Sequence, residues 1–284
     1  MDAIASLPLM DDFQLAVNGV DAAIPLDRLS GLRKCVVRGA LAPSVLGSLA
    51  HVIGHSPYLS HLVILPNSSS VFSESCIPFS KIPSAISLPL RHLTVRASQI
   101  DLNPIRHITG LNSLSLEDHD IGRDTNVYPD FLQERLFCSR LVVQHVHPTW
   151  LNYLSQYSGL QELSVLIRDP ANPFSDQLAR QFWATVLPKH AATLQVLNIY
   201  SKGAGGWCSS DEAILAIMQC RQLRSLTLSV DPRLTDHVQL FDDGHFEHDY
   251  NQYTFDKIVG LLIFVENIIS DHMHSGFFYH GPVT

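Results

Sequence analysis

The chain has 284 residues, of which 46% are hydrophobic and 16% are charged, so it can bury a large core and lacks the composition of a disordered chain. Its formal net charge of −8 argues against a general nucleic-acid binder and against binding to a membrane surface. The first residues, MDAIASLPLMDDF, lack the basic start of a secretory signal, and the longest strongly apolar run, residues 258–265, is too short to span a bilayer. We therefore expect a soluble protein of the cytoplasm or nucleus.

The cysteines form no recognisable framework. Their number is odd, and no two of them have the C-x-x-C spacing of a zinc or redox site. We expect reduced and mostly buried thiols that act as small apolar residues. The five are Cys35, Cys76, Cys138, Cys208 and Cys220.

One short pattern returns along most of the chain: an apolar residue, two others, an apolar residue, one other, and a third apolar residue. The middle residues of successive copies are separated by 21 to 34 positions, with a mean of about 27, close to the roughly 20–29 residues of a leucine-rich repeat. In a short strand the last two apolar residues point to one side, where they can stack on neighbouring copies. The eight copies are Leu32/Cys35/Val37, Leu59/Leu62/Ile64, Leu90/Leu93/Val95, Leu111/Leu114/Leu116, Cys138/Leu141/Val143, Leu160/Leu163/Val165, Leu194/Leu197/Ile199 and Leu223/Leu226/Leu228.

Helical stretches lie between several of these strands. Apolar residues at helical spacing predict helices over residues 43–54, 148–157, 176–192 and 209–220, the last with Ser209 and Glu212 at the spacing of a capping box. Strand followed by helix, repeated, predicts an α/β fold. The specific form is a right-handed leucine-rich-repeat solenoid of about eight irregular repeats, with a parallel sheet on its concave face and helices on its convex face.

The pattern also divides the chain into three parts. Residues 1–28 are expected to form an N-terminal cap, and residues 29–230 the solenoid. Residues 231–284 are expected to contain an irregular polar loop followed by a C-terminal capping helix at 254–270. Terminal units of repeat proteins need such caps because one side of their core has no neighbour.

Two passages carry a resemblance to a known family. They are FWATVLPKHAATLQVLNIYSKGAGGWC at residues 182–208 and CRQLRSLTLSV at residues 220–230. With them, residues 29–230 resemble the leucine-rich-repeat region of F-box-like proteins of mushroom-forming (basidiomycete) fungi. The resemblance implies that the repeats hold a substrate protein for the ubiquitin pathway, while an N-terminal F-box would bind the adaptor of a cullin-type ligase. No F-box module is evident in residues 1–28, so we do not expect them to bind that adaptor.

Two features could carry chemistry instead. The glycine turn Gly203–Gly206 follows a predicted strand, as phosphate-binding loops do, but it lacks the complete dinucleotide or P-loop pattern. A polar segment concentrates histidine and aspartate at Asp242, Asp243, His245, His248 and Asp249, with spacing that fits no familiar zinc motif. We predict a binding module that is not an enzyme and has no cofactor or metal; an enzyme or metal-binding protein using one of these features, and a degenerate repeat protein without present function, remain the alternatives.

The residues that alternate with the buried ones would face a partner. On the first three predicted strands they include five basic or imidazole side chains and no acid, against the negative charge of the whole chain. We predict that this surface binds an acidic or phosphorylated segment of a partner protein, since arginine pairs well with such groups. The candidate partner-binding residues are Lys34, Arg38, His61, His92, Arg96 and Arg140.

Overall fold

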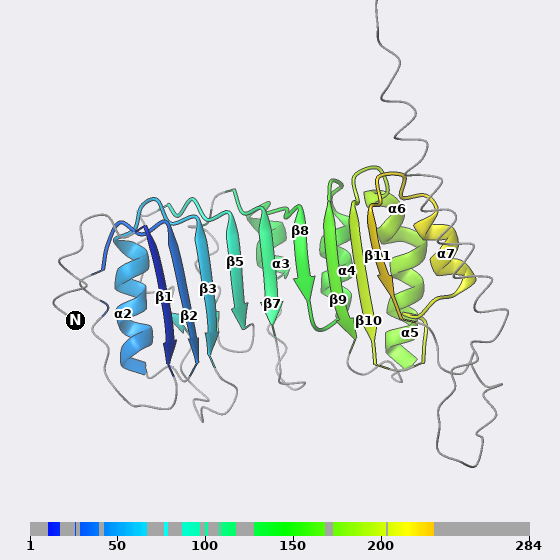
Figure 1. Ribbon diagram of the computed structural model, residues 1–284. Helices are drawn as coiled ribbons and strands as arrows, with labels where there is room; N and C mark the ends of the chain where they lie inside the picture. The colour runs from blue at the N-terminus through cyan, green and yellow to red at the C-terminus, as the bar shows by residue number, and fades with distance from the viewer. Residues whose placement is uncertain are drawn as a thin grey trace, which may run out of the picture. The chain divides into compact units, whose positions relative to one another are not determined.

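The computed structural model divides into two compact units, residues Met1–Gln144 and His145–Thr284, called here unit 1 and unit 2 (Figure 1). The secondary structure of the chain is α/β, and all pairs of strands are parallel among the described residues. The structure describes residues 11–17, 26, 29–39, 43–66, 77–78, 87–96, 100–101, 108, 110–117, 128–167, 173–202 and 204–229.

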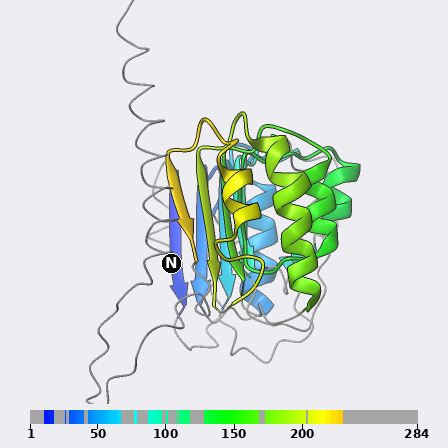
Figure 2. The same ribbon diagram turned by 90° about the vertical axis from the view of Figure 1, so that its right-hand side faces the viewer.

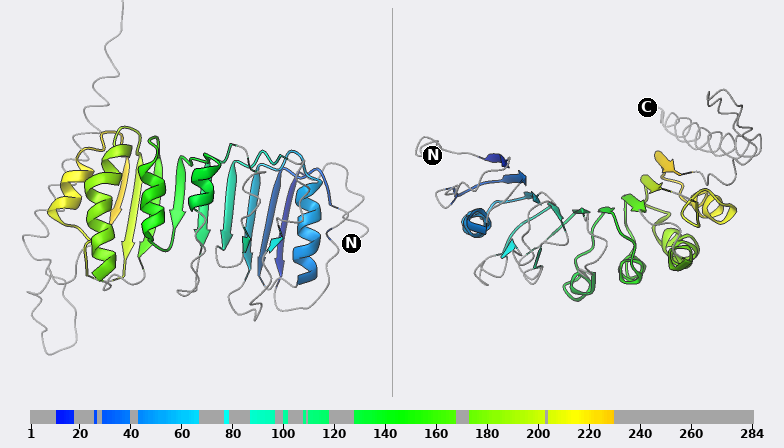
Figure 3. Two further views of the ribbon diagram at one scale, coloured as in Figure 1. Left: turned by 180° about the vertical axis from the view of Figure 1, so that it is seen from behind. Right: turned by 90° about the horizontal axis from the view of Figure 1, so that it is seen from below.

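Unit 1 is built on a parallel sheet. Helices α2 (Pro43–Gly54) and α3 (Tyr128–Gln133) lie on one face of it, and no described helix lies on the other (Figure 3). A short parallel pair, β4 (Ile77–Pro78) and β6 (Ile100–Asp101), forms separately. The strands of the main sheet are, in spatial order, β1 (Asp12–Val17), β2 (Lys34–Gly39), β3 (His61–Pro66), β5 (His92–Arg96), β7 (Ser113–Glu117) and β8 (Arg140–Val143).

Unit 2 repeats the arrangement with more helix. Its parallel strands are β9 (Glu162–Ile167), β10 (Val196–Ser201) and β11 (Ser225–Leu228). The helices gather on one face of these strands (Figure 2). They are α4 (Pro148–Ser155), α5 (Pro173–Gln181), the π-helical turn η4 (Phe182–Val186), α6 (Leu187–His190) and α7 (Asp211–Ile217).

The helix predictions are confirmed in position and corrected in detail. The helix at 43–54 has the predicted bounds, whereas the one at 148–157 ends at Ser155. The helix predicted at 176–192 begins earlier, at Pro173, and contains a π-helical turn. The predicted cap Ser209 is wrong by one residue, because Ser210 Oγ accepts the Ala213 N–H at 3.2 Å. Helix α3 was not predicted, and the capping helix predicted at 254–270 lies outside the described residues.

Strands form at all eight predicted positions, and their middle residues align in register. In unit 1 the register joins Cys35, Leu62, Leu93, Leu114 and Leu141. In unit 2 it joins Leu163, Leu197 and Leu226. All of these except the half-buried Leu226 are buried, so inward side chains of neighbouring strands stack directly on one another.

The first strand, β1, was not predicted. It pairs with β2 in parallel, so that Phe13 aligns with Cys35 and Leu15 with Val37. Met10, Phe13 and Leu15 carry the same apolar spacing as the eight predicted copies, so the sequence contained a signal for this strand. Part of the predicted N-terminal cap is therefore a further strand of the same sheet.

A backbone contact fixes each register. The carbonyl of the residue directly before a strand, called here the strand-start carbonyl, accepts two N–H groups at the start of the neighbouring strand. The Ser60 carbonyl, for example, accepts the N–H groups of Arg91 and His92 at 2.9 and 3.0 Å. The same contact recurs at the carbonyls of Asp11, Arg33, Arg91, Asn112, Gln161 and Gln195.

Three glycines occupy an equivalent position, two residues before the strand-start carbonyl. Gly31, Gly110 and Gly159 have φ of +71°, +75° and +108°, and a Cβ on any of them would meet nothing within 4 Å. The chain thus turns from the preceding segment into the strand through a left-handed conformation. Glycine is required there by its backbone angles and not by lack of space.

We expect Gly159→Ala to lower the free energy of unfolding by about 1–2 kcal/mol, because an L-residue is strained at this φ. Urea unfolding followed by circular dichroism measures the change. Ser158→Ala, at the exposed neighbouring position, is the control and is expected to stay within about 0.5 kcal/mol of the parent chain. Equal free energies of unfolding for the two variants would show that the left-handed turn does not require glycine for stability.

A buried histidine joins helix α6 to the start of β9 in unit 2. His190 is 1% exposed, and its Nδ1 accepts the Leu160 N–H at 3.3 Å. Its Nε2 lies 3.0 Å from the Leu154 carbonyl oxygen and donates to it, which makes the ring the neutral Nε2–H tautomer. Burial lowers the pKa of His190 below its ordinary value of 6.5, with the Leu154 carbonyl opposing the shift and the charge of Lys189 adding to it.

The lowered pKa predicts a pH-dependent stability. The unfolded chain takes up a proton at this residue before the folded chain does, so stability is full above about pH 6.5 and falls as the pH drops toward the lowered pKa. We expect the free energy of unfolding of the wild type to fall more steeply between about pH 7 and 5 than that of His190→Gln. Parallel slopes for the two chains would contradict this assignment.

Candidate partner-binding surface

The candidate surface is the face of the unit 1 sheet on which no described helix lies. Side chains that alternate with the buried ones form rows across the strands. The first row contains the first residue of each strand, namely Asp12, Lys34, His61, His92, Ser113 and Arg140. The outward rows contain the first, third and fifth residues of the strands. The third row, made of the fifth residues, lies toward the other end of the strands and contains Ala16, Arg38, Leu65, Arg96 and Glu117.

The structure brings all six predicted residues into these two rows. Lys34, His61, His92 and Arg140 stand in the first, and Arg38 and Arg96 in the third. Their common placement follows from the strand positions, because alternation assigns every second side chain to the same face.

The first row also contains an acid, which lies on the unpredicted strand β1. Asp12 of β1 aligns with Lys34, and its Oδ2 accepts a hydrogen bond from Lys34 Nζ at 2.8 Å. The absence of acid holds for the three predicted strands, but β1 adds this carboxylate beside them. Part of the positive charge of Lys34 is therefore already neutralised within the protein.

The two arginines of the third row differ in exposure. Arg38 is exposed, whereas Arg96 is 8% exposed and aligns with Glu117 on the next strand. A partner can reach the guanidinium of Arg38 directly, while Arg96 is enclosed. Arg38 and Arg140 are thus exposed cations, whereas Lys34 is half-buried and paired with Asp12.

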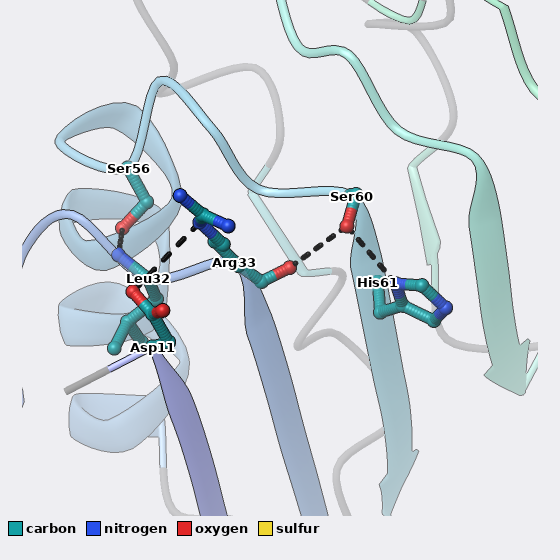
Figure 4. Close-up of polar contacts among 6 residues, drawn as sticks. All are labelled: Asp11, Leu32, Arg33, Ser56, Ser60 and His61. Atoms are coloured by element: carbon teal, nitrogen blue, oxygen red, sulfur yellow. Dashed lines mark hydrogen bonds and ion pairs between the residues drawn. The ribbon is translucent and has the colours of Figure 1, made fainter.

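Polar contacts order the start of strands β2 and β3 (Figure 4). Ser60 Oγ donates to the Arg33 carbonyl at 3.2 Å and lies 3.0 Å from His61 Nδ1. Because the hydroxyl has one hydrogen, the ring Nδ1–H is the donor in the second contact, which leaves His61 Nε2 as the proton acceptor. Arg33 Nε also lies 3.8 Å from Asp11 Oδ1, and both of these side chains are largely exposed.

His61 and His92 form a stacked pair in the middle of the first row. Their ring centroids are 4.1 Å apart and their planes differ by 21°. Both side chains are half-buried. The pKa of His92 is lowered, first by burial and then by the positive charges of His61, Arg140 and Arg91.

The corresponding face of unit 2 has a different character. Asn198 Nδ2 donates to Ser164 Oγ at 3.1 Å, and Thr227 lies beside Asn198 on the next strand. Glu162 is the one charged side chain in the outward positions of its described strands. The basic character is thus specific to unit 1.

The glycine turn of unit 2 packs tightly against helix α5. The Gly206 N–H donates to Asp176 Oδ1 at 2.6 Å, and the Gly206 carbonyl accepts from Trp183 Nε1 at 2.8 Å. A Cβ at Gly206 would lie 3.0 Å from Ala179 Cβ. Close packing explains the glycine at position 206, and side chains of the protein already bind its backbone N–H and carbonyl groups. Gly203 lies outside the described residues.

The described cysteines have the environment expected of structural thiols. Cys35, Cys138, Cys208 and Cys220 are free and buried, as predicted, while Cys76 lies outside the described residues. Burial raises the pKa of Cys35 to about 12, with Asp12 adding to the effect, and raises that of Cys220 to about 12 by itself. Such thiols are poor nucleophiles at neutral pH because the thiolate is the reactive form.

Neither a cluster suited to a metal ion nor a helix able to cross a membrane occurs in the described residues. No group of three or more histidine, cysteine, aspartate or glutamate side chains within them is arranged to hold a metal ion. None of the helices in the described ranges combines the length and the apolar character needed to cross a membrane. The predicted cluster at Asp242, Asp243, His245, His248 and Asp249 lies outside those ranges.

The fold and the surface define a class of protein. It is a parallel α/β protein with strands in register and, in each unit, one sheet face without a described helix. Comparisons with protein-family models, with curated proteins and with solved structures found no match to the chain.

We expect Cys35 and Cys220 to resist alkylation by iodoacetamide at about pH 8 in the folded chain, since their pKa values of about 12 leave very little thiolate. The same residues should react fully in urea. Mass spectrometry of the digested protein measures both states. Rapid modification of either residue in the folded chain would contradict the structural assignment.

Proposed function

We propose that this chain is a leucine-rich-repeat solenoid that serves as a protein–protein interaction module. The observation that carries the proposal is the register of the strands, which buries one set of side chains and presents the alternate set on a face without described helices. Neighbouring strands in register provide a broad and fixed surface, as binding proteins made of repeats use. The repeating strand-start contact supports the same assignment.

The partner is an acidic or phosphorylated protein segment that binds the first and third rows of unit 1. Arg38 and Arg140 supply accessible permanent charge at the two rows, and the imidazole pair lies between β2 and β7. Arginine favours carboxylate and phosphate groups because its planar N–H donors match their oxygens. The two charges lie on different strands, so a partner segment that contacts both must cross the sheet.

The family resemblance adds a narrower form of the proposal. In it, the chain is the substrate-recognition part of an F-box-like ubiquitin-ligase receptor. Affinity capture of the tagged chain, with the cullin adaptor added or omitted, separates the two forms. Retention of the adaptor supports the receptor form, whereas capture of an acidic partner without it supports an interaction module alone.

We expect Arg38→Glu/Arg140→Glu to reduce the affinity for the captured partner at least tenfold, because each reversal replaces attraction by repulsion at the proposed surface. Affinity capture from the source cells identifies the partner, and fluorescence anisotropy measures its binding to the purified chains. The matched control is Lys202→Glu/Arg221→Glu, which reverses two exposed charges in unit 2 and should leave the affinity unchanged.

The comparison of the two double variants decides the assignment. Loss of affinity in the unit 1 variant alone supports binding at the first and third rows. Equal affinity in all three chains would overturn the proposed surface, and equal losses in both variants would indicate a response to net charge. Circular dichroism verifies that each variant retains its fold.

A further inference from the structure

The stacked histidines lie where a bound anion can change their protonation. They lie on adjacent strands of the first row, between Lys34 on β2 and Ser113 on β7. Their 4.1 Å centroid separation places two protonatable rings in contact. His61 Nδ1 is already engaged with Ser60 Oγ at 3.0 Å, so His61 Nε2 is the ring nitrogen left for a ligand.

The charged groups around the pair are mostly positive. Lys34 stands on the His61 side, and Arg91 and Arg140 act on His92. The nearest acid in the row is Asp12, which lies beyond Lys34 and pairs with it. A proton on either ring therefore meets repulsion from the other ring and from these cations.

A bound anion changes this balance. A carboxylate placed over the pair adds a negative charge directly beside the rings, and it stabilises an imidazolium ring in preference to a neutral one. By linkage, a ligand that favours protonation binds more tightly when protons are more abundant. Protonation of the pair and binding of an anion therefore strengthen each other at this position.

We propose that the His61–His92 pair couples binding of the acidic partner segment to proton uptake, so that unit 1 binds carboxylate-rich segments more tightly in mildly acidic solution than at neutral pH. This inference rests on the proposed function and adds the regulation of its surface. Histidine is suited to the role because its ordinary pKa lies near neutrality, and the lowered pKa of His92 keeps that ring neutral at pH 7.

A peptide of fixed charge provides the test. Hexaglutamate labelled with tetramethylrhodamine, whose charge is constant in this range, remains largely ionised between about pH 7.5 and 5.5, so a change in its affinity reports on the protein. Anisotropy titrations with the full chain at low salt should show about tenfold tighter binding at the lower pH, because the bound anion favours the protonated pair. The variant His61→Gln/His92→Gln should bind with nearly the same affinity at both pH values.

The chain contains a matched control. His51 and His55 form a second stacked imidazole pair, with centroids 3.8 Å apart, both exposed and at the end of α2. The variant His51→Gln/His55→Gln removes the same number of titrating groups from unit 1, and it should retain the tenfold pH dependence. A dependence lost in this variant as well would overturn the assignment to His61 and His92.

A second readout does not require a partner. In NMR titrations of the imidazole resonances, His61→Gln should raise the pKa of His92, because the repulsion between the rings is removed. Unchanged titration of His92, or equal peptide affinity at the two pH values in the wild type, would overturn the proton coupling and leave the interaction surface to its own charge-reversal test. Absence of hexaglutamate binding at both pH values would also overturn the coupling. The proposed binding surface is tested separately: unchanged partner affinity of the Arg38→Glu/Arg140→Glu variant would overturn it.

Discussion

The register of the parallel strands is the constraint on which the rest of each unit depends. A strand-start carbonyl that accepts two N–H groups from the following strand fixes where that strand begins. A shift of one residue would exchange the buried and outward side chains along the whole strand. The aligned leucines of unit 1, such as Leu62, Leu93 and Leu114, show the buried side of this register.

The same register leaves the outward side chains with a smaller part in the hydrophobic core. Since the inward residues carry the hydrophobic stabilisation, the alternate residues can differ from one unit to the other without loss of the fold. Unit 1 uses them for arginine, lysine and imidazole side chains, and unit 2 mainly for neutral ones such as the Ser164–Asn198 hydrogen bond. A uniform core is thus compatible with two chemically distinct surfaces.

The candidate surface could be predicted in membership but not in electrostatics. Alternation was enough to select Lys34, Arg38 and Arg140, because it depends only on local strand geometry. The pairing of Lys34 with Asp12 joins side chains 22 positions apart in the chain, and alternation within a strand does not specify such a contact. The enclosure of Arg96 depends on neighbours in space, which alternation does not specify.

The sequence by itself determined the α/β class, the positions of eight strands and the face on which the candidate residues lie, since short-range periodicity reflects which side chains are buried. Tertiary structure alone decided the contacts between distant residues. It brought His61 and His92, 31 positions apart, into a stack, and it enclosed His190 between two backbone groups of unit 2. Such contacts depend on the variable lengths of the segments between strands, and only the folded chain brings their ends together.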